Sequence, residues 1–405
     1  MNLKFLKSKV LLATVGATLA AISISSVCMA AYGGGTDVLD AWNTSPMADL
    51  RVAGSTTVWP IVQQALNIPQ AGGTSTTSPF QAYANPSGTI FAQVFEGGSG
   101  HGRSAVNTYS ALPGETTQQD ANVGMSSSGT NAACVQDPIA RDGVCMIVSD
   151  QGGVLDTVPG LTLAQIKGIY EGTITNWSQV GGPSLAIFPV ARIVGSGTRD
   201  ALISFAGITD ATEQTYIGSI ANDPREDATS DAVAAVANHT AGAIGYVGVG
   251  YANSQVAPVR VLPISANVTP AVYVAANDQT VTNNTYPMSR FLFLIEGATL
   301  PSTAATEGPW ASKLVTYLAA TDAGQNIVKN QGFVMLNPRQ DVNSDGTVNI
   351  TDVVKIGLAW NKSSSDTGYV LADDVNRDGK INISDVVSVG LWWNITELPV
   401  PANQW

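Results

Sequence analysis

Short apolar runs bounded by glycine alternate with segments of helical periodicity along most of the chain. The runs are rich in Val, Ile and Phe, which favour buried strands. In the segment LTLAQIKGIYEG, Thr162 is a suitable N-cap, and the apolar residues after it share one helical face: Leu163, Ile166, Ile169 and Tyr170. Alternating strands and helices are typical of α/β proteins with parallel sheets that are covered on both faces. The expected strands are RVAGS, DGVCMIVS, LAIFPVARIVGSG, AIGYVGVG, VRVLPI and SRFLFLIE.

The length of the α/β pattern, residues 49–338, has a consequence for the architecture. About 290 residues are more than one such sheet needs, so we expect two lobes. The chain would enter the second lobe near DGVCMIVS and leave it after GAIGYVGVGYA, so that this lobe holds about 143–254. A ligand would then lie in the cleft between the lobes, and the cleft would close on binding.

The first 30 residues have the pattern of a secretory signal, because three lysines precede an apolar run that ends in small residues. A retained membrane anchor and lipidation at Cys28 are the alternatives. Residues 31–48 are rich in glycine and polar side chains and are expected to form a linker. We therefore expect a secreted protein associated with a cell surface.

The chain carries 19 Lys and Arg against 31 Asp and Glu, which gives a net charge of −12. Removal of the leader with its lysines would make the mature chain more negative still. Such a surface disfavours binding to nucleic acid and to anionic membranes. An anion would have to be bound by local geometry rather than by the overall charge.

Two cysteines, Cys134 and Cys145, remain after removal of the leader. In an exported chain, cysteines this close in sequence favour a disulfide bond. Two buried thiols are the alternative. Nine N-x-S/T sequons fit an extracellular glycoprotein without establishing a glycan. They lie at Asn43, Asn176, Asn238, Asn267, Asn283, Asn349, Asn361, Asn382 and Asn394.

The segment 339–398 differs in composition from the rest and repeats internally. DVNSDGTVNITDVV begins at Asp341, and DVNRDGKINISDVV begins at Asp374. Each copy has oxygen ligands at loop positions 1, 3, 5 and 12, glycine at position 6 and a carbonyl at position 7, which is the pattern of a Ca²⁺-binding loop. The expected ligands are Asp341, Asn343, Asp345, Thr347 and Asp352 in the first loop, and Asp374, Asn376, Asp378, Lys380 and Asp385 in the second.

This repeat resembles a type I dockerin, because position 12 is Asp rather than Glu and an apolar helix follows each loop without one before it. The resemblance implies a small all-α module that folds around two Ca²⁺ ions and binds a cohesin on another protein. Loop positions 10 and 11 would dominate the contact, and the internal symmetry would permit two orientations. Those positions are Ile350, Thr351, Ile383 and Ser384. Three tryptophans would belong either to the module's core or to its docking face: Trp360, Trp392 and Trp393.

Four loops of the α/β region combine small hydroxyl residues with glycine before an expected helix start. They are VAGSTTVWPIV, EGGSGHGRSAV, NVGMSSSG and VARIVGSGTRDAL. Main-chain N–H groups at a helix N-terminus, together with hydroxyl groups, can bind an oxyanion. The candidate ligand-binding residues are Ser55, Thr56, Thr57, Ser99, Ser127, Arg192, Ser196, Gly197 and Thr198.

In order and content, these loops resemble the phosphate-binding subunits of phosphate ABC importers, which are type II periplasmic binding proteins. LTLAQIKGIYEGTITNWSQVGG and GQNIVKNQGFVMLN extend the similarity, which covers residues 50–337. The resemblance implies a two-lobed fold in which Arg192 makes a two-pronged contact with phosphate. Ser196, Gly197 and Thr198 would then contact the remaining oxygens.

Two positions depart from the family pattern. Well-studied members have an aspartate in the third loop that accepts the proton of hydrogen phosphate, whereas this chain has Ser127. Members often have an acidic residue two positions after the arginine, whereas this chain has Val194. The first change weakens discrimination of phosphate from sulfate, and the second leaves Arg192 without its usual partner.

The sequence therefore predicts an extracellular binding protein for phosphate or a related oxyanion, tethered through its dockerin to a cohesin-bearing partner. A cell-surface or matrix protein that reuses the fold without transport is the alternative, and an ABC importer permease is a further candidate partner. A secreted hydrolase is disfavoured, because the two histidines form no triad pattern. We expect His101 to face solvent, and donation of a hydrogen bond to the anion is the alternative.

Overall fold

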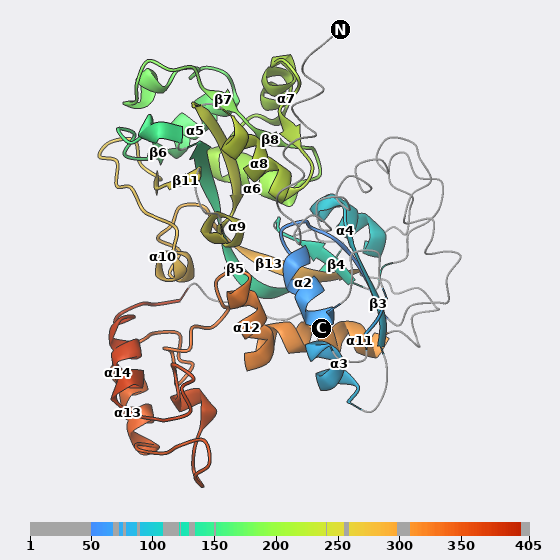
Figure 1. Ribbon diagram of the computed structural model, residues 1–405, viewed down its shortest axis with the longest axis vertical. Coiled ribbons are helices and arrows are strands. Elements are labelled where there is room, and N and C mark those ends of the chain that lie inside the picture. The colour runs from blue at the N-terminus through green and yellow to red at the C-terminus, as the bar shows by residue number, and fades with distance from the viewer. Residues whose placement is uncertain are drawn as a thin grey trace, which may run out of the picture.

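The computed structural model shows two α/β lobes and a smaller helical module beside them (Figure 1). The predicted leader and linker, with Asn43, lie outside the described residues. In the described part of the chain, no helix is long and apolar enough to cross a membrane. The structure describes residues 50–67, 73–75, 78–86, 90–107, 121, 123–128, 134–149, 151–239, 241–254, 259–297 and 308–397.

The first lobe is a mixed sheet in the order β2-β3-β1-β4-β13-β5. Its central strand β1 is parallel to β3 and β4, whereas β13 is antiparallel to β4 and β5. All of β1 is buried, as expected for a strand covered by helices. The strands are β1 (Leu50–Gly54), β2 (Gly73–Ser75), β3 (Ile90–Glu96), β4 (Val123–Ser126), β5 (Cys134–Ser149) and β13 (Ser289–Gly297), and the helices are α2 (Trp59–Leu66), α3 (Pro79–Ala84), α4 (Gly98–Asn107), α11 (Gly308–Ala320) and α12 (Asp322–Asn330).

The second lobe is built on the other half of β5, which pairs antiparallel with β10 and β11. The predicted helix after Thr162 is confirmed as α5, and Thr162 forms a capping box with Gln165. The elements are β6 (Leu161–Thr162), β7 (Phe188–Pro189), β8 (Ala191–Arg192), β9 (Arg225–Glu226), β10 (Ala243–Gly248), β11 (Val259–Leu262), β12 (Ile264–Ser265), α5 (Leu163–Tyr170), α6 (Gly197–Ala206), α7 (Asp210–Ser219), α8 (Thr229–Asn238) and α9 (Val249–Ser254), with short 3₁₀ helices η4 (Gln151–Gly153) and η5 (Trp177–Val180). The expectation of parallel sheets holds only in part, because the shared strand β5 runs antiparallel to β10, β11 and β13.

The two half-sheets are joined through β5 itself. Residues 134–143 pair with β13 of the first lobe, and residues 144–149 pair with β10 and β11 of the second. Hydrogen bonding is therefore continuous between the lobes along this one strand. The chain also leaves the second lobe later than the predicted residue 254, because β11 and β12 still pair with β5 and β6. The return passes through α10 (Asp278–Thr282) to β13.

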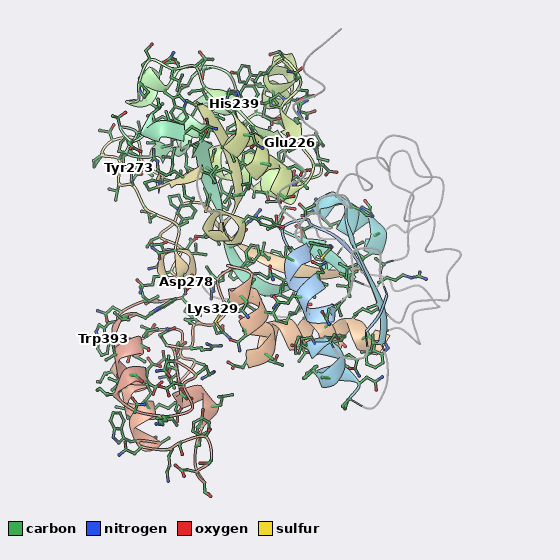
Figure 2. All side chains as sticks on the ribbon, viewed as in Figure 1. Glu226, His239, Tyr273, Asp278, Lys329 and Trp393 are labelled. Carbon is green, nitrogen blue, oxygen red and sulfur yellow. The ribbon has the colours of Figure 1, made fainter. Side chains whose placement is uncertain are left out.

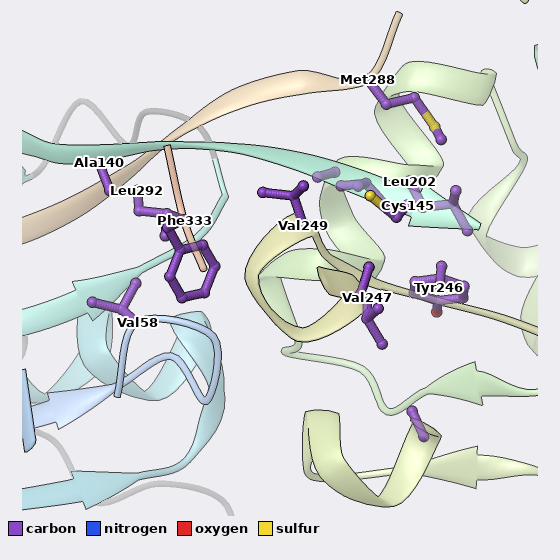
Figure 3. Packing of buried hydrophobic residues seen from close by; sticks show 14 of the residues in the cluster. Val58, Ala140, Cys145, Leu202, Tyr246, Val247, Val249, Met288, Leu292 and Phe333 are labelled. Carbon is purple, nitrogen blue, oxygen red and sulfur yellow. The ribbon is translucent and has the colours of Figure 1, made fainter. Parts of the chain in front are cut away.

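Cys145 lies in the core near the hinge, where it packs beside Leu202 and Met288 (Figure 3). It is a free, fully buried thiol, so the predicted disulfide with Cys134 is wrong. The physical reason is that both cysteines belong to β5. Eleven residues of extended strand span roughly 35 Å, whereas the Cα atoms of a disulfide lie within about 7 Å of each other.

The C-terminal module consists of two nearly identical halves. Each half is an acidic loop followed by a helix, α13 (Ile350–Leu358) or α14 (Ile383–Gly390), and η7 (Leu371–Asp373) precedes the second loop. Loop position 4 is left-handed in both copies, with φ of 60° at Ser344 and 62° at Arg377. A small core that includes Val348, Ile356, Ile381 and Val389 joins the halves.

Candidate functional site

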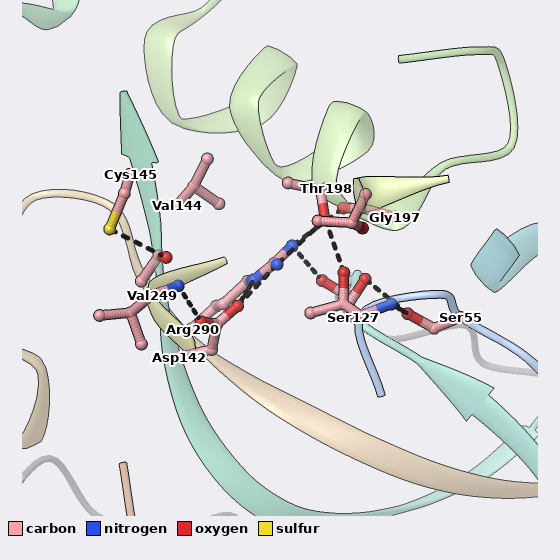
Figure 4. Close-up of polar contacts among 12 residues, drawn as sticks. Ser55, Ser127, Asp142, Val144, Cys145, Gly197, Thr198, Val249 and Arg290 are labelled. Carbon is pink, nitrogen blue, oxygen red and sulfur yellow. Dashed lines mark hydrogen bonds and ion pairs between the residues drawn. The ribbon is translucent and has the colours of Figure 1, made fainter. Parts of the chain in front are cut away.

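The four predicted anion loops meet between the lobes, and Figure 4 labels residues from three of them. The loops around Ser55, Ser99 and Ser127 belong to the first lobe, and the loop from Arg192 to Thr198 belongs to the second. Loops are usually exposed, so their burial here marks a closed cleft. The predicted residues buried in it are Ser55, Thr56, Thr57, Ser99, Ser127, Arg192, Ser196, Gly197 and Thr198.

Hydroxyl groups from the two lobes touch each other across this cleft. The Oγ1 atoms of Thr57 and Thr198 are 3.0 Å apart. The Oγ1 atoms of Thr56 and Thr229 are 3.2 Å apart. Thr229 begins α8 and was missed by the sequence analysis, because ATSDA carries no glycine turn and no resemblance to the anion loops. The lobes are therefore closed around a set of neutral donors and acceptors.

Glycine is required where the loops approach each other. A Cβ atom on Gly197 would lie 2.2 Å from Oγ of Ser99 and 2.7 Å from Oγ of Ser127. The main chain of the two lobes is also bonded directly, because the N–H of Gly100 donates to the carbonyl of Gly195 over 3.2 Å. The glycines of these loops thus allow backbone and hydroxyl groups to converge on one point.

Ser127 occupies the centre of the first-lobe donors. Its Oγ accepts a hydrogen bond from Ser55 over 3.0 Å and lies 3.3 Å from Oγ of Ser99. Its N–H donates to Oγ of Ser99 over 2.9 Å. A serine hydroxyl can donate or accept, so this position does not by itself require a proton on the ligand.

Arg192 reaches from β8 into the cleft and contacts both lobes. Its Nη2 donates to Oγ1 of Thr56 over 3.0 Å, and its Nη1 donates to Oγ1 of Thr229 over 2.8 Å. Main-chain carbonyl groups hold the guanidinium on its other edge. Nε donates to the carbonyl of Glu226 over 3.0 Å, and the carbonyl of Asp227 accepts from Nη2. The forked end of the side chain is thereby presented to the threonine hydroxyls.

These carbonyl groups resolve the question raised by Val194. The side chain of Val194 is 59% exposed and takes no part in the site. Glu226 and Asp227 instead orient Arg192 through their backbone. Burial raises the pKa of the Asp227 carboxyl, and the positive charge of Arg192 opposes that shift.

Arg290 is a second buried guanidinium beside the cleft, and the sequence analysis missed it (Figure 4). Its Nη1 donates to the carbonyl groups of Ser127 over 2.6 Å and Gly197 over 3.2 Å, and its Nη2 donates to Oγ1 of Thr198 over 3.2 Å. The carboxylate of Asp142 neutralises it, with Nε and Oδ2 2.8 Å apart. One side chain therefore fastens the third loop to the fourth. Asp142 and Arg290 each stand at the start of an apolar run, RDGVCMIVS and SRFLFLIE. A charged residue in this position of two expected strands is the sequence signal that could have predicted the pair.

A more exposed ion pair also crosses the cleft, between Nη2 of Arg103 on α4 and Oδ2 of Asp200 on α6, 3.6 Å apart. Burial raises the pKa of Asp200, and Arg103 opposes that shift. The expectation that His101 faces solvent is wrong, because this side chain is buried within α4.

The N-terminus of α6 points its first amides into the site. Ser196 is the N-cap, and its Oγ accepts from the N–H of Arg199. The N–H groups of Gly197 and Thr198 belong to the first turn, which has no partner inside the helix. The helix dipole adds partial positive charge at this end. Hydroxyls, amides and a guanidinium together form a donor set suited to a tetrahedral oxyanion.

The two acidic loops have matching hydrogen-bond patterns. In the first, Oδ2 of Asp341 accepts from the N–H of Gly346 over 2.8 Å, and in the second, Oδ2 of Asp374 accepts from Gly379 over 2.9 Å. The position-12 carboxylates are fully buried and close each loop on itself. Asp352 accepts from the N–H groups of Asn343 and Asn349, and Asp385 accepts from those of Asn376 and Asn382.

The donor chemistry of these loops fits a hard cation such as Ca²⁺, which prefers six to eight oxygen ligands. Within the described residues, however, no three carboxylate, imidazole or thiol groups converge closely enough to hold a metal by themselves. The carboxylate of Asp345 accepts from the N–H of Thr347 and the amide of Asn343. A cation would therefore need the amide and main-chain oxygens of each loop as well as its carboxylates.

The residues expected to bind a partner lie at the start of α13 and α14. Ile350 and Ile383 are exposed, whereas the hydroxyls of Thr351 and Ser384 bond to Asn349 and Asn382 in their own loops. The exposed apolar stripe continues along each helix: Val354 and Leu358 lie on α13, Val387 lies on α14, and Leu391 is the C-cap of α14. Trp392 is partly buried against the core of the module, and Trp360 and Trp393 are exposed.

Comparison with known proteins agrees with this architecture. A family model described as a PBP superfamily domain matches residues 40–322. The chain belongs to the PBP superfamily. A second model, the dockerin type I domain, matches residues 339–389. The PBP domain is thus followed directly by a dockerin, and type I dockerins are calcium-binding modules.

Two curated relatives of the PBP domain are phosphate-binding proteins named PstS. The protein from Bacillus subtilis is 26% identical over 288 residues, which cover 70% of this chain and 80% of the relative. The protein from Borreliella burgdorferi is 25% identical over 185 residues, which cover 44% of this chain and 58% of the relative.

Solved structures share the fold of the PBP domain. One is a structure with bound phosphate from Clostridium perfringens, assigned as a phosphate ABC transporter substrate-binding protein. It has a TM-score of 0.53 and 22% sequence identity, and the match covers 71% of this chain and 99% of that chain. Another is the phosphate-binding protein PfluDING, with a TM-score of 0.51 and 15% identity, over 81% of this chain and 98% of that one. These likenesses confirm the two-lobed fold.

Proposed function

We propose that this protein is an extracellular binding protein for phosphate, or for a closely related oxyanion, and that its dockerin tethers it to a cohesin-bearing partner. The observation that carries the first part is the position of Arg192, which is buried between the lobes with threonine hydroxyls of both lobes at its forked end. The ligand-binding relatives PstS and PfluDING support phosphate as the anion.

The chemistry of the cleft suits a small oxyanion. A guanidinium forms two parallel hydrogen bonds to two oxygens of one anion, and hydroxyl and amide donors replace the rest of its hydration shell. The donors come from both lobes, so an anion would hold them together. The proposed ligand-binding residues are Ser55, Thr56, Thr57, Ser99, Ser127, Arg192, Ser196, Gly197 and Thr198.

Discrimination between anions would depend on Ser127. Its hydroxyl contacts Ser55 and Ser99 and can turn toward either a protonated or an unprotonated oxygen. We therefore propose that the protein distinguishes phosphate from sulfate less strictly than a site with a carboxylate at this position. Arsenate, which has the charge and shape of phosphate, would bind as well.

We further propose that each acidic loop binds one Ca²⁺ through positions 1, 3, 5, 7 and 12. A bound ion supplies positive charge that relieves the repulsion among the loop's carboxylates and joins its two ends. The burial of Asp352 and Asp385 supports this proposal, because a buried carboxylate needs a charge partner. Folded loops would then set the positions of α13 and α14.

The tether would use the exposed stripes of α13 and α14. Six apolar side chains at equivalent positions of two related helices are unusual on a free surface, and apolar surface patches commonly mark protein interfaces. A cohesin could contact either stripe first, since the halves are nearly equivalent. We propose Ile350, Thr351, Ile383 and Ser384 as the positions nearest the partner.

Isothermal titration of the mature protein with phosphate, sulfate and arsenate tests the anion. We expect saturable binding of phosphate and arsenate and weaker binding of sulfate. Absence of heat with all three anions would contradict the proposed ligand. Pull-down on a type I cohesin, with and without a chelator, tests the tether, and binding that is indifferent to calcium would contradict it.

A further inference from the structure

We propose that the dockerin has a second binding face, separate from its helix stripes, and that this face binds the hinge of the chain's own PBP domain. The proposal rests on the calcium-folded dockerin proposed above but not on phosphate binding. Binding through this face would hold the two domains in one fixed arrangement, instead of leaving them as two modules on a flexible connection.

The connection between the domains is too short and too ordered to act as a free linker. Leu336 is buried in the PBP domain, and its N–H and carbonyl are bonded to Gln325 and Arg141. The first acidic loop begins at Asp341, whose N–H donates to the carbonyl of Pro338. The dockerin therefore starts within a few residues of the hinge.

The first contact is an ion-pair cluster on α12. Asp322 accepts from Nε of Arg377 over 3.1 Å and from Nη2 over 2.6 Å. Nε of Arg339, between the domains, lies 3.5 Å from the same carboxylate. These hydrogen bonds lower the pKa of Asp322, chiefly through Arg377. Bidentate arginine–carboxylate pairs fix orientation as well as distance.

Arg377 also breaks the symmetry of the dockerin. It occupies position 4 of the second loop, and its counterpart in the first loop is Ser344. Both residues have the same left-handed backbone, so the loops differ here in side chain and not in shape. A serine could not reach Asp322 from this position. The sequence difference therefore selects which half of the dockerin faces α12.

The second contact reaches the hinge strand itself. Nη2 of Arg141, on β5, donates to Oε2 of Glu397 over 3.1 Å, and both side chains are buried. The N–H of Glu397 donates to the carbonyl of Gly346 in the first acidic loop. Arg141 also donates to the carbonyl of Thr282, on the return segment of the hinge. Loss of this carboxylate would remove a charge partner from a buried arginine.

A third contact joins the dockerin to α10. Nε2 of Gln279 donates to the carbonyl of Leu391 over 2.7 Å, while the side chain of Leu391 stays exposed. Asp278 and Lys329 lie between the PBP domain and the dockerin (Figure 2). With Trp392 they line an interdomain cavity of about 100 Å³. The interface thus touches both segments of the hinge, β5 and α10, and leaves both helix stripes uncovered.

Hydrogen–deuterium exchange of the full chain in calcium buffer, without phosphate, tests the second face. The double variant Asp322→Asn, Glu397→Gln removes one charge from each of the two ion-pair contacts without changing side-chain volume. The control Asp156→Asn makes the same change in an exposed pair with Arg260 in the second lobe. We expect exchange in peptides covering 138–146 and 278–283 to be roughly tenfold faster in the double variant, as for the loss of a charged hydrogen bond. The control should match the unmodified protein.

Equal protection of these peptides in all three proteins would overturn the proposal. Exchange in peptides covering the two acidic loops reports whether the dockerin itself is folded. A protein with folded loops and an unprotected hinge would contradict the second face and leave the anion and calcium proposals standing. Chelator should expose the hinge peptides of the unmodified protein to the level of the double variant, and a chelator-insensitive hinge would also count against the proposal.

Discussion

Arg290 and Asp142 form an almost completely buried ion pair at the hinge, with Nη2 and Oδ2 2.7 Å apart. They are direct neighbours across β13 and β5. Asp142 also accepts the N–H of Val249 over 2.7 Å, which ties the start of α9 to the same point. The neighbouring residue Arg141 binds Glu397, so two consecutive residues of β5 serve the anion cleft and the dockerin.

Breaking this hinge pair should strongly destabilise the PBP domain. We expect Asp142→Asn or Arg290→Gln alone to lower the free energy of unfolding by about 3–5 kcal/mol, because each leaves a buried charge without its partner. The double variant should lose less than the sum of the two. Urea unfolding of all three measures this. Asp156→Asn, in an exposed pair, should cost less than about 1 kcal/mol, and additive losses in the double variant would refute the coupling.

Replacement of Arg192 should remove most anion affinity. We expect Arg192→Gln to weaken phosphate binding by about 2–5 kcal/mol, because a buried charged donor is lost while the closed cleft remains. Isothermal titration measures the dissociation constant. Arg225→Gln is the control, since its partner Asp223 lies on the surface of the second lobe. A dissociation constant unchanged by Arg192→Gln would show that the anion is held elsewhere.

Ser127 should set the choice between phosphate and sulfate. A carboxylate there would accept the proton of hydrogen phosphate and repel sulfate, which has no proton to offer. We expect Ser127→Asp to lower sulfate affinity relative to phosphate by roughly tenfold or more, which corresponds to about 1.4 kcal/mol. Ser127→Asn, of the same size without the charge, is the control. Competition titrations at pH 8 give the ratio, and equal ratios in the two variants would contradict this role.

Thiol chemistry should confirm that Cys145 is unpaired. Burial raises the pKa of Cys145 far above its usual value, so its thiolate is scarce in the folded protein. We expect Cys145 to resist alkylation in the native state and to react fully in denaturant without reductant. Mass spectrometry of the peptide containing Cys145 detects this. Recovery of a peptide that joins Cys134 to Cys145 would contradict the structure.

Loss of a position-12 carboxylate should remove one calcium ion. We expect Asp352→Ala and Asp385→Ala each to reduce the calcium stoichiometry from two to one, because each removes the ligand expected to chelate through two oxygens. Each variant also removes a helix capping box, which adds about 1 kcal/mol of destabilisation. Calcium titration followed by tryptophan fluorescence measures both effects. Asp366→Asn, outside both loops, should retain two ions, and a variant that keeps both ions would refute the ligand assignment.

The sequence by itself determined the features that depend on local spacing. The acidic repeat, the helix capped by Thr162 and the four hydroxyl-rich loops each require residues only a few positions apart. Their backbone conformation follows from glycine, capping side chains and apolar periodicity, which act over one or two turns. The resemblance then implied that these four loops would meet around one anion.

Tertiary structure decided what depends on long-range pairing. The predicted disulfide is wrong because Cys134 and Cys145 lie on one long strand. The spacing of two cysteines does not show whether the residues between them form an extended strand or a loop. Arg290 joined the site because β13 runs beside Asp142 on β5, although the two residues are far apart in sequence. Arg192 found main-chain carbonyl partners in place of the missing acid at Val194, and carbonyl groups leave no signature in a sequence. In each case the deciding contact comes from which strands lie side by side, and that is a property of the folded chain alone.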